Sequence, residues 1–161
     1  MLTTKRLREL LHYDYSTGLF TWRVSLRGRF ARVGTKAGGL DPRGYLQICL
    51  DGHRYFASRL VWLYEHGVWP VGEIDHINGL HADNRLENLR DVTRTGNQQN
   101  LRCACASNKT GFLGVSAHMG RYRAVIGHVG RKIHIGRFDT PEAAHQAYLK
   151  AKRELHEFCT I

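Results

Sequence analysis

The stretch that decides the fold is DHINGLHADNRLENLRDVTRTGNQQN, residues 75–100. It starts inside a short segment, Glu73–Ile77, that predicts a strand, and it continues through a polar loop of Asn, Gly, His and Asp. Leu86–Val92 then leads into a second strand, and Thr93 caps a predicted helix that ends at about Leu101. Two strands and a helix therefore enclose a segment crowded with polar side chains.

Three side chains of this segment make a candidate chemical centre: Asp75, His76 and Asn97. Successive strand residues point to opposite faces, so the Asp75 carboxylate and the His76 imidazole serve different sides of the strand. A carboxylate and an amide form a hard oxygen pair that suits Mg²⁺. An unprotonated histidine near neutral pH activates a water molecule, and a divalent ion relieves charge on a phosphodiester. On residues alone, however, an Asp-His pair is more often structural than catalytic.

Charge is distributed unevenly along the 161 residues, whose net charge is +10. Residues 1–57 carry ten Lys and Arg against four Asp and Glu, residues 58–107 carry five against six, and residues 108–161 carry nine against four. Basic flanks favour a polyanionic partner, because Lys and Arg release counterions from phosphates. The acids in the middle segment suit a cation site. A generically basic protein is the alternative reading of the same numbers.

The segment before the centre predicts small elements. Leu2 to about Leu11 forms an amphipathic helix with Thr3 or Thr4 as its cap. The Asp51-Gly52 turn makes a hairpin of residues 45–57, and a helix capped by Ser58 ends at Gly67. The Gly- and Arg-rich residues 25–44 form a basic loop that either contacts DNA or is mobile. No apolar run is long enough for a membrane span, and no signal peptide is recognisable, which favours an intracellular protein.

The string at residues 75–100, together with GYLQICLDGHRYFASRLVWLYEHGVWPVG before it, closely resembles the HNH endonuclease family, in particular its bacteriophage and intron-encoded homing members. The resemblance covers about residues 45–102. It implies a ββα-metal fold, one divalent ion, Mg²⁺ or Mn²⁺, per site, and cleavage of DNA in the cytoplasm of a phage-infected host cell.

The resemblance also implies roles for single residues. Asp75 resembles the metal-binding aspartate, His76 the general base, Asn88 the middle residue that orients the histidine and braces the loop, and Asn97 the third-position metal ligand. Many family members have histidine at the third position, and the asparagine here favours Mg²⁺ or Mn²⁺ over zinc. Asn84 and Asn100 are alternative candidates that read better as structural residues, and His81 reads as a solvated loop histidine. Arg85 and Arg94 are candidates for phosphate contacts, although each is as readily a solvated charge.

The last third predicts a three-stranded antiparallel sheet on one helix. Strands are expected at 112–116, 122–127 and 132–138, and Thr140 with Pro141 opens a helix whose apolar face includes Ala143 and Ala144. One sheet face carries basic side chains that suit DNA contacts, or that are simply solvated: Arg121, Arg123, Lys132, His134 and Arg137.

The string GFLGVSAHMGRYRAVIGHVGRKIHIGRFDTPEAAHQAYLKAKRELHEF resembles the DNA-binding domain of the Apetala and ethylene-response-factor family over about residues 108–158. It implies DNA binding through the sheet. His118, Tyr122 and His134 occupy or neighbour the places of that family's sheet tryptophans, so the target sequence does not carry over. Phage homing endonucleases pair these two modules in the same order.

These readings predict an α+β protein: a basic helix and hairpin region (1–57), a ββα-metal nuclease core (58–102), a linker (103–110) and a DNA-binding domain (111–158). The expected function is metal-dependent cleavage of double-stranded DNA by a monomer or homodimer without a membrane partner. A DNA-binding regulator with a non-catalytic HNH unit is the alternative.

Overall fold

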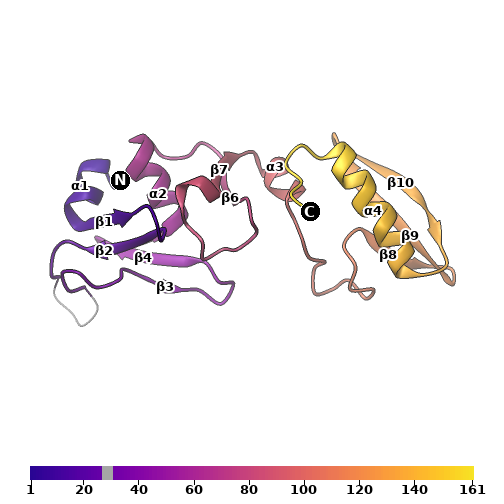
Figure 1. Ribbon diagram of the computed structural model, residues 1–161, viewed down its shortest axis with the longest axis horizontal. Helices are drawn as coiled ribbons and strands as arrows, with labels where there is room; N and C mark the ends of the chain where they lie inside the picture. Colours follow the sequence, from indigo (N-terminus) through magenta and orange to yellow (C-terminus); the bar gives the residue numbers. More distant parts are fainter. Residues whose placement is uncertain (27–30) are drawn as a thin grey trace. The chain divides into compact units, whose positions relative to one another are not determined.

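The computed structural model describes residues 1–26 and 31–161, so residues 27–30 of the predicted basic loop lie outside the described part. The described chain mixes helices and strands and divides into two compact units, Met1–Arg94 (unit 1) and Thr95–Ile161 (unit 2) (Figure 1). The positions of the two units relative to one another are not determined, and each is described by itself. Within the described ranges, no helix is long and apolar enough to cross a membrane.

Unit 1 opens with a helix and an antiparallel hairpin, which in chain order are α1 (Thr4–Leu10), β1 (Leu11–Asp14) and β2 (Leu19–Trp22). The Thr3 side chain accepts a hydrogen bond from the backbone of Arg6, so Thr3 is the cap of α1. The predicted end of this helix is one residue too late, because Leu11 already pairs with Trp22 in the hairpin. A strand of four residues is too short for its alternation to stand out beside a helix.

A second hairpin follows as predicted, with β4 (Leu46–Leu50) and β5 (His53–Phe56) joined by Asp51 and Gly52, both at positive φ. The short β3 (Gly39–Leu40) adds to β4, inside the segment predicted as loop. Helix α2 (Ala57–His66) is followed by Gly67, which is its C-cap in the left-handed conformation with a φ of 74°. The predicted end of this helix is confirmed. The predicted Ser58 cap is wrong, because the helix begins at Ala57 and no side chain caps it.

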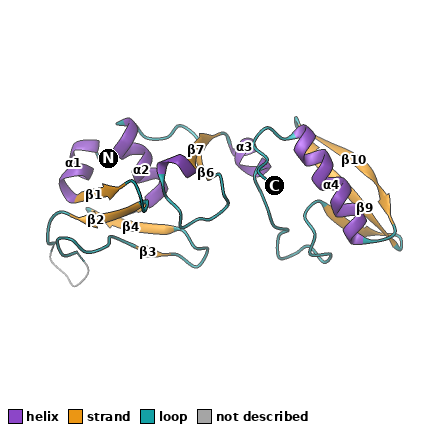
Figure 2. Cartoon of the chain, in the orientation of Figure 1, coloured by secondary structure: helices purple, strands orange, loops and turns teal. Residues whose placement is uncertain are grey.

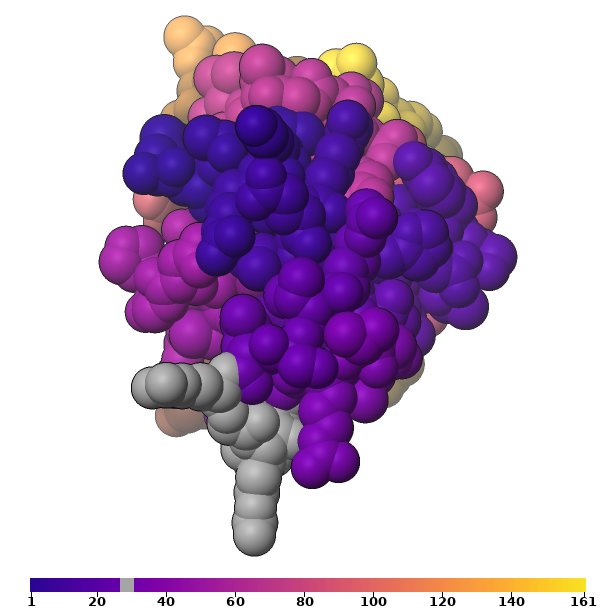
Figure 3. Space-filling model, turned by 90° about the vertical axis from the view of Figure 1, so that its left-hand side faces the viewer, coloured from indigo at the N-terminus to yellow at the C-terminus, as the bar shows by residue number. Residues whose placement is uncertain are grey.

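The remaining strands of unit 1 are β6 (Glu73–His76) and β7 (Leu89–Val92), which pair antiparallel. One hydrophobic cluster joins most of these elements, since it includes Leu7 of α1, Phe20 of β2, Leu60 of α2 and Leu89 of β7. The N-terminal region and the two strands of the candidate centre therefore share a core. Figure 3 shows N-terminal residues, coloured indigo to violet, over much of the unit 1 surface on that side.

Unit 2 contains α3 (Arg94–Gln99), which begins at the unit boundary, then β8 (Val115–His118), β9 (Arg121–His128), β10 (Arg131–Phe138) and α4 (Pro141–Leu155). The three strands form an antiparallel sheet in the order β10-β9-β8, and α4 covers one of its faces (Figure 2). Thr140 caps α4 and Pro141 is its first residue, as predicted. The core of unit 2 consists of Val115, Ala124, Ile126, Ala144 and Tyr148.

Two details of unit 2 differ from the sequence reading. The first strand begins at Val115 rather than at residue 112, because Phe112 and Leu113 form a turn closed by the hydrogen bond from Val115 N to Phe112 O (3.2 Å). Gly114 completes that turn at a φ of 75°. Ala143, predicted on the apolar face of α4, is exposed, whereas Ala144 is fully buried.

Candidate functional site

The antiparallel pairing of β6 with β7 determines where the two central residues of the candidate site lie. Asp75 pairs with Arg90 and His76 with Leu89, and the hydrogen bond from Ile77 N to Asn88 O (2.9 Å) extends the ladder by one step. Both Asp75 and His76 are buried, with 5% and 3% of their surface exposed. Two adjacent buried polar residues at a strand end need partners inside the protein, because an unpaired buried polar group is costly.

His76 is held by Asn84, which belongs to the loop between β6 and β7. The ring Nε2 lies 3.3 Å from Asn84 Oδ1, and Asn84 Nδ2 donates to Ala82 O at 3.2 Å. An amide oxygen only accepts, so this contact keeps the ring proton on Nε2 and makes Nδ1 the basic nitrogen. Burial lowers the pKa of His76 below its ordinary value, against the opposing effect of the Asn84 hydrogen bond. The lowered pKa favours the neutral form of the ring, and the hydrogen bond to Asn84 places its proton on Nε2.

Asp75 forms an ion pair that the sequence reading missed. Nε and Nη2 of Arg90 approach Asp75 Oδ2 at 2.8 and 2.7 Å, and the two side chains are 22% and 7% exposed. The pair follows directly from the β6–β7 register, because residues opposite each other in an antiparallel pair share one face. An acid in one predicted strand and an arginine in the next would have been a usable signal.

Asn88, in the short helical turn η1 (Leu86–Asn88), braces the loop between the strands. Its Oδ1 accepts from Asn78 N (2.9 Å) and its Nδ2 donates to Asp83 O (2.8 Å). The Asn78 side chain in turn donates to Asp83 Oδ2 at 2.8 Å. These contacts agree with the bracing expected of Asn88. The role of Asn88 in orienting His76 stays a prediction. The side chain that contacts the His76 ring is Asn84.

Arg85 lies in the same loop, where its guanidinium is already engaged. It pairs with Asp83 (2.7 Å) and with Glu87 (3.0 Å), and the hydrogen bonds from Arg85 lower the pKa of Asp83 to about 2. A contact of Arg85 with a phosphate would compete with these carboxylates. Arg94 is exposed at the start of α3. The roles of Arg85 and Arg94 toward DNA remain predictions.

His81, expected to be a solvated loop histidine, is half-buried and packed against another ring. Its ring stacks on Tyr45, with centroids 4.0 Å apart and planes at 10°, and its Nδ1 lies 3.0 Å from Arg43 O. The His81 and His76 rings are 5.8 Å apart. The sequence gives no hint of this contact, because Tyr45 is more than thirty positions away in the β4 region.

Asn97, the predicted second metal ligand, lies in α3 within unit 2, whereas Asp75 lies in unit 1. Since the arrangement of the units is not determined, the pairing of these two oxygen donors stays a prediction. In the described part of the chain, no group of three or more His, Cys, Asp or Glu side chains could hold a metal ion. One carboxylate with one amide is a different donor set, which leaves coordination positions for water and phosphate oxygens, as Mg²⁺ prefers.

Unit 2 gathers the five predicted basic residues on one face of its sheet. Arg121 and Arg123 alternate along β9, and Arg137 pairs with Arg123. In β10, Lys132 and His134 pair with Gly127 and Val125, which continue the same side of β9. A shift of register between His134 and Gly136 keeps Arg137 on the face of His134, although strict alternation would turn it away. The opposite face carries the buried Ala124 and Ile126 under α4.

This basic face contains a donor that lacks a partner. Nε of Arg123 is buried and has no hydrogen-bond acceptor among the described residues. Arg121 forms an exposed ion pair with Asp139 at 2.8 Å. Lys132, His134 and Arg137 are exposed. The exposed cations of this face make it a suitable surface for a polyanion.

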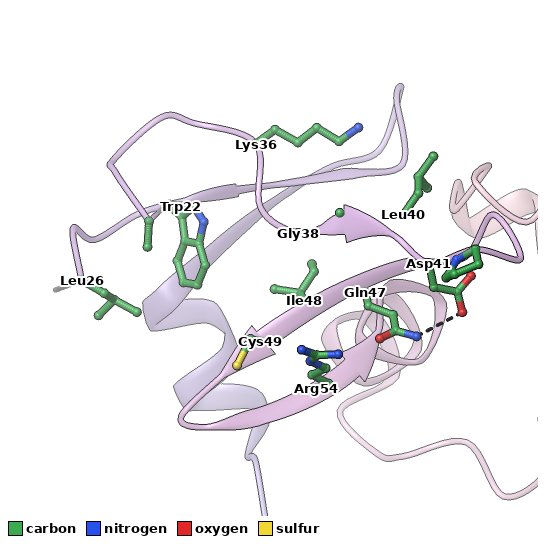
Figure 4. A pocket seen from close by; sticks show the side chains of 13 residues that line it. Trp22, Leu26, Lys36, Gly38, Leu40, Asp41, Gln47, Ile48, Cys49 and Arg54 are labelled. Atoms are coloured by element: carbon green, nitrogen blue, oxygen red, sulfur yellow. Dashed lines mark hydrogen bonds between the residues drawn. The ribbon is translucent and has the colours of Figure 1, made fainter. Parts of the chain in front are cut away.

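Unit 1 also contains a cavity of about 710 Å³ beside β3 and β4 (Figure 4). Trp22 and Ile48 line it together with the polar side chains of Lys36, Gln47 and Arg54, and Gln47 donates to Asp41 at 3.2 Å. None of the predicted site residues lines this cavity. It is therefore separate from the His76 centre.

A comparison with family models finds a match over part of the chain, residues 55–99. No curated protein and no solved structure gives a significant match to the chain. The family model described as HNH endonuclease matches residues 55–99, a range that contains Asp75, His76, Asn84, Asn88 and Asn97. The match supports an HNH nuclease, a family whose members generally use a divalent metal ion and act on DNA.

Proposed function

We propose that this protein is a metal-dependent endonuclease that hydrolyses phosphodiester bonds in double-stranded DNA. His76 acts as the general base, Asp75 and Asn97 hold one Mg²⁺ or Mn²⁺ ion, and Asn88 braces the loop beside them. The basic sheet face of unit 2 grips the DNA. The observation that carries the proposal is the His76 ring, buried at the end of β6 inside the matched range and held by Asn84 as a neutral base.

The residues of the chain have distinct tasks in this reaction. His76 accepts a proton from the attacking water at Nδ1, because Nε2 carries the proton that faces Asn84. Arg90 holds the Asp75 carboxylate in a fixed orientation at a buried position. A divalent ion held by Asp75 and Asn97 would supply charge neutralisation at the scissile phosphate and stabilisation of the leaving oxygen.

Binding of DNA is assigned to unit 2, whose sheet face carries five basic side chains. Such a face provides affinity through phosphates and discrimination through arginine contacts to guanine. The proposed enzyme is of the homing type and acts in the cytoplasm of a host cell that carries the phage. One active site cuts one strand, so a monomer nicks DNA and a double-strand break requires a dimer or a second binding event.

Supercoiled plasmid tests the proposal directly. Incubation with the protein and Mg²⁺ should give relaxed and then linear DNA, and His76→Ala should lower the cleavage rate by roughly 10²–10⁴-fold, the usual contribution of a general base. His53→Ala, which removes an exposed histidine from β5, is the matched control and should cleave at the wild-type rate. Cleavage that survives in His76→Ala would overturn the assignment of the base.

A DNA-binding regulator is the second candidate, and the Asp75–Arg90 ion pair favours it. The carboxylate proposed to hold the ion already has a cationic partner. The regulator predicts band shifts with DNA that are equal in wild type and His76→Ala, with no relaxed product at any Mg²⁺ concentration. The nuclease predicts the same band shifts with cleavage in the wild type alone.

A further inference from the structure

The β1–β2 hairpin, outside the range matched by the family model, contacts the segment that holds His76. Tyr13 of β1 is 1% exposed, and its hydroxyl donates to Asn84 O (2.9 Å) and accepts from Leu86 N (3.1 Å). Its ring is fixed by the rings of Tyr15, Phe20 and Tyr64, whose centroids lie 4.9, 5.2 and 5.9 Å away. One buried hydroxyl thus satisfies two backbone groups on either side of Arg85.

The turn of the same hairpin lies directly against this segment. Gly18, at a φ of 70°, approaches so closely that a Cβ atom there would lie 2.4 Å from Arg85 N and 2.6 Å from the carbonyl carbon of Asn84. Asp14 fixes the turn, because its carboxylate accepts hydrogen bonds from Ser16 and Thr17. The turn is therefore shaped to bring backbone against backbone, which only glycine permits here.

Asn84 connects the hairpin to the imidazole. Its backbone carbonyl is held by Tyr13, its Nδ2 by Ala82 O and its Oδ1 by His76 Nε2, and 1% of its surface is exposed. The backbone carbonyl and both ends of the side-chain amide thus each have a defined partner. A displacement of the backbone at Asn84 would move the amide oxygen away from the ring.

From these contacts we propose that the β1–β2 hairpin is a positioning element of the active site: Tyr13 and Gly18 fix the backbone of Asn84, and Asn84 fixes the orientation and tautomer of His76. The proposal rests on the function proposed above. A base must be aimed at its water to within fractions of an ångström, since a misplacement of about 1 Å costs on the order of 10²-fold in rate. Tyr13 and Gly18 are positioning residues that touch neither DNA nor the reacting water.

Kinetics on plasmid DNA provide the first test. Asn84→Leu removes the amide at nearly constant volume and should lower kcat roughly 10²-fold, and Tyr13→Phe should lower it roughly tenfold, both at unchanged KM. Tyr64→Phe is the control for Tyr13→Phe, because Tyr64 packs in the same aromatic cluster while its hydroxyl makes no hydrogen bond within residues 1–26 and 31–161. Equal losses in the two tyrosine variants would overturn the proposal.

A pair of glycine substitutions separates the close contact from backbone strain. Gly18→Ala and Gly52→Ala both place an alanine at positive φ, but a Cβ at Gly52 meets nothing within 4 Å. We expect Gly18→Ala to lower kcat at least tenfold and Gly52→Ala to leave it unchanged. Equal kcat values in these two variants, with both folded by circular dichroism, would contradict a role of the hairpin turn.

The ring nitrogens of His76 give a readout that does not depend on cleavage. In the metal-free wild-type protein, ¹⁵N NMR at a pH where the ring is neutral should show the Nε2–H tautomer, and Asn84→Leu, Tyr13→Phe and Gly18→Ala should each shift the ring toward a mixture of tautomers. If the wild type does not cleave DNA but these shifts occur, the nuclease proposal fails while the hold of the hairpin on His76 stands. If the wild type cleaves and the folded variants keep the wild-type tautomer, the positioning proposal fails.

Discussion

The two units differ in where their polar side chains lie. Unit 1 buries Asp75, His76, Asn84 and Asn88 and pairs them inside the protein, whereas unit 2 leaves its basic side chains on an open sheet face. A buried polar network loses much when one member is removed, because the others keep their desolvation cost. An exposed set of charges contributes in small, nearly independent amounts that salt screens. Variants in the two units should therefore differ in the size and in the kind of their effect.

The largest effect is expected at the buried ion pair of unit 1. Arg90→Met removes the arginine that holds Asp75 Oδ2 and should lower the free energy of unfolding of unit 1 by about 3 kcal/mol, since breaking a buried pair strands its charge. Urea unfolding followed by tryptophan fluorescence measures this unit alone, because all three tryptophans, Trp22, Trp62 and Trp69, lie in it.

The effect of Mg²⁺ on the stability of Arg90→Met tests whether Asp75 binds the ion. If Asp75 holds the ion, Mg²⁺ at 100 times its Kd should restore about 2.7 kcal/mol to Arg90→Met. The double variant Asp75→Leu with Arg90→Met should not respond to Mg²⁺ at all. A magnesium response that is the same in the double variant would show that the ion binds elsewhere.

In unit 2 the most sensitive position is the close contact between Gly114 and the ring of Tyr148. Gly114 has a φ of 75°, and a Cβ there would lie 2.0 Å from the ring of Tyr148. Gly114→Ala should lower the stability of unit 2 by about 2 kcal/mol, from overpacking and left-handed strain together. Amide hydrogen exchange in β9 should speed up, and the tryptophan transition of unit 1 should stay where it is.

Gly111→Ala is the matched control, because Gly111 has a similar φ of 73° and no atom within 4 Å of its Cβ position. Faster exchange in both variants to the same extent would show that strain alone, and not the Tyr148 contact, decides the stability of unit 2.

The sequence predicted the elements of both units better than it predicted their contacts. Local signals gave the Asp51-Gly52 hairpin turn, the Gly67 helix end and the Thr140 cap, because each depends on a few neighbouring residues. The stacking of His81 on Tyr45 and the contact of Tyr13 with Asn84 join residues far apart in the chain. Local patterns do not contain such pairs, so they emerged only with the fold.

The basic face of unit 2 shows a second limit of prediction from sequence patterns. Lys132, His134 and Arg137 share one face only because the register shifts between His134 and Gly136. Strict alternation would place Arg137 on the other side of the sheet. The prediction of a common face depended on a bulge that the sequence pattern does not announce, whereas Asp75 and His76 needed only the end of a strand.

A smaller effect is expected for single charges on this face. Arg123→Gln and Lys132→Gln should each weaken DNA binding by about 1 kcal/mol and lower the slope of log K against log salt concentration by about 0.9, the value for one phosphate contact. Fluorescence anisotropy with a labelled duplex at several salt concentrations measures both quantities. Arg153→Gln, on α4 rather than on the sheet, should leave the slope unchanged. A slope that falls equally in Arg153→Gln would mean that the sheet face has no special role.

The smallest effect is the acid sensitivity of the unit 1 loop. Asp83 has a folded-state pKa of about 2, below the ordinary 3.8, chiefly because Arg85 donates hydrogen bonds to it. A lowered pKa in the folded state means that the unfolded chain binds more protons between these values, so stability rises with pH there. The contribution is complete above about pH 4 and is lost as the pH falls through 2. Because Arg85 is 40% exposed, solvent screening keeps it below about 1 kcal/mol. Asp83→Asn should therefore reduce the loss of unfolding free energy at acid pH, as measured by tryptophan fluorescence.

Asp139→Asn is the control, because it removes an ion pair from the exposed face of unit 2, and it should leave this acid dependence unchanged. If the acid dependence persists in Asp83→Asn, it belongs to another carboxylate of unit 1.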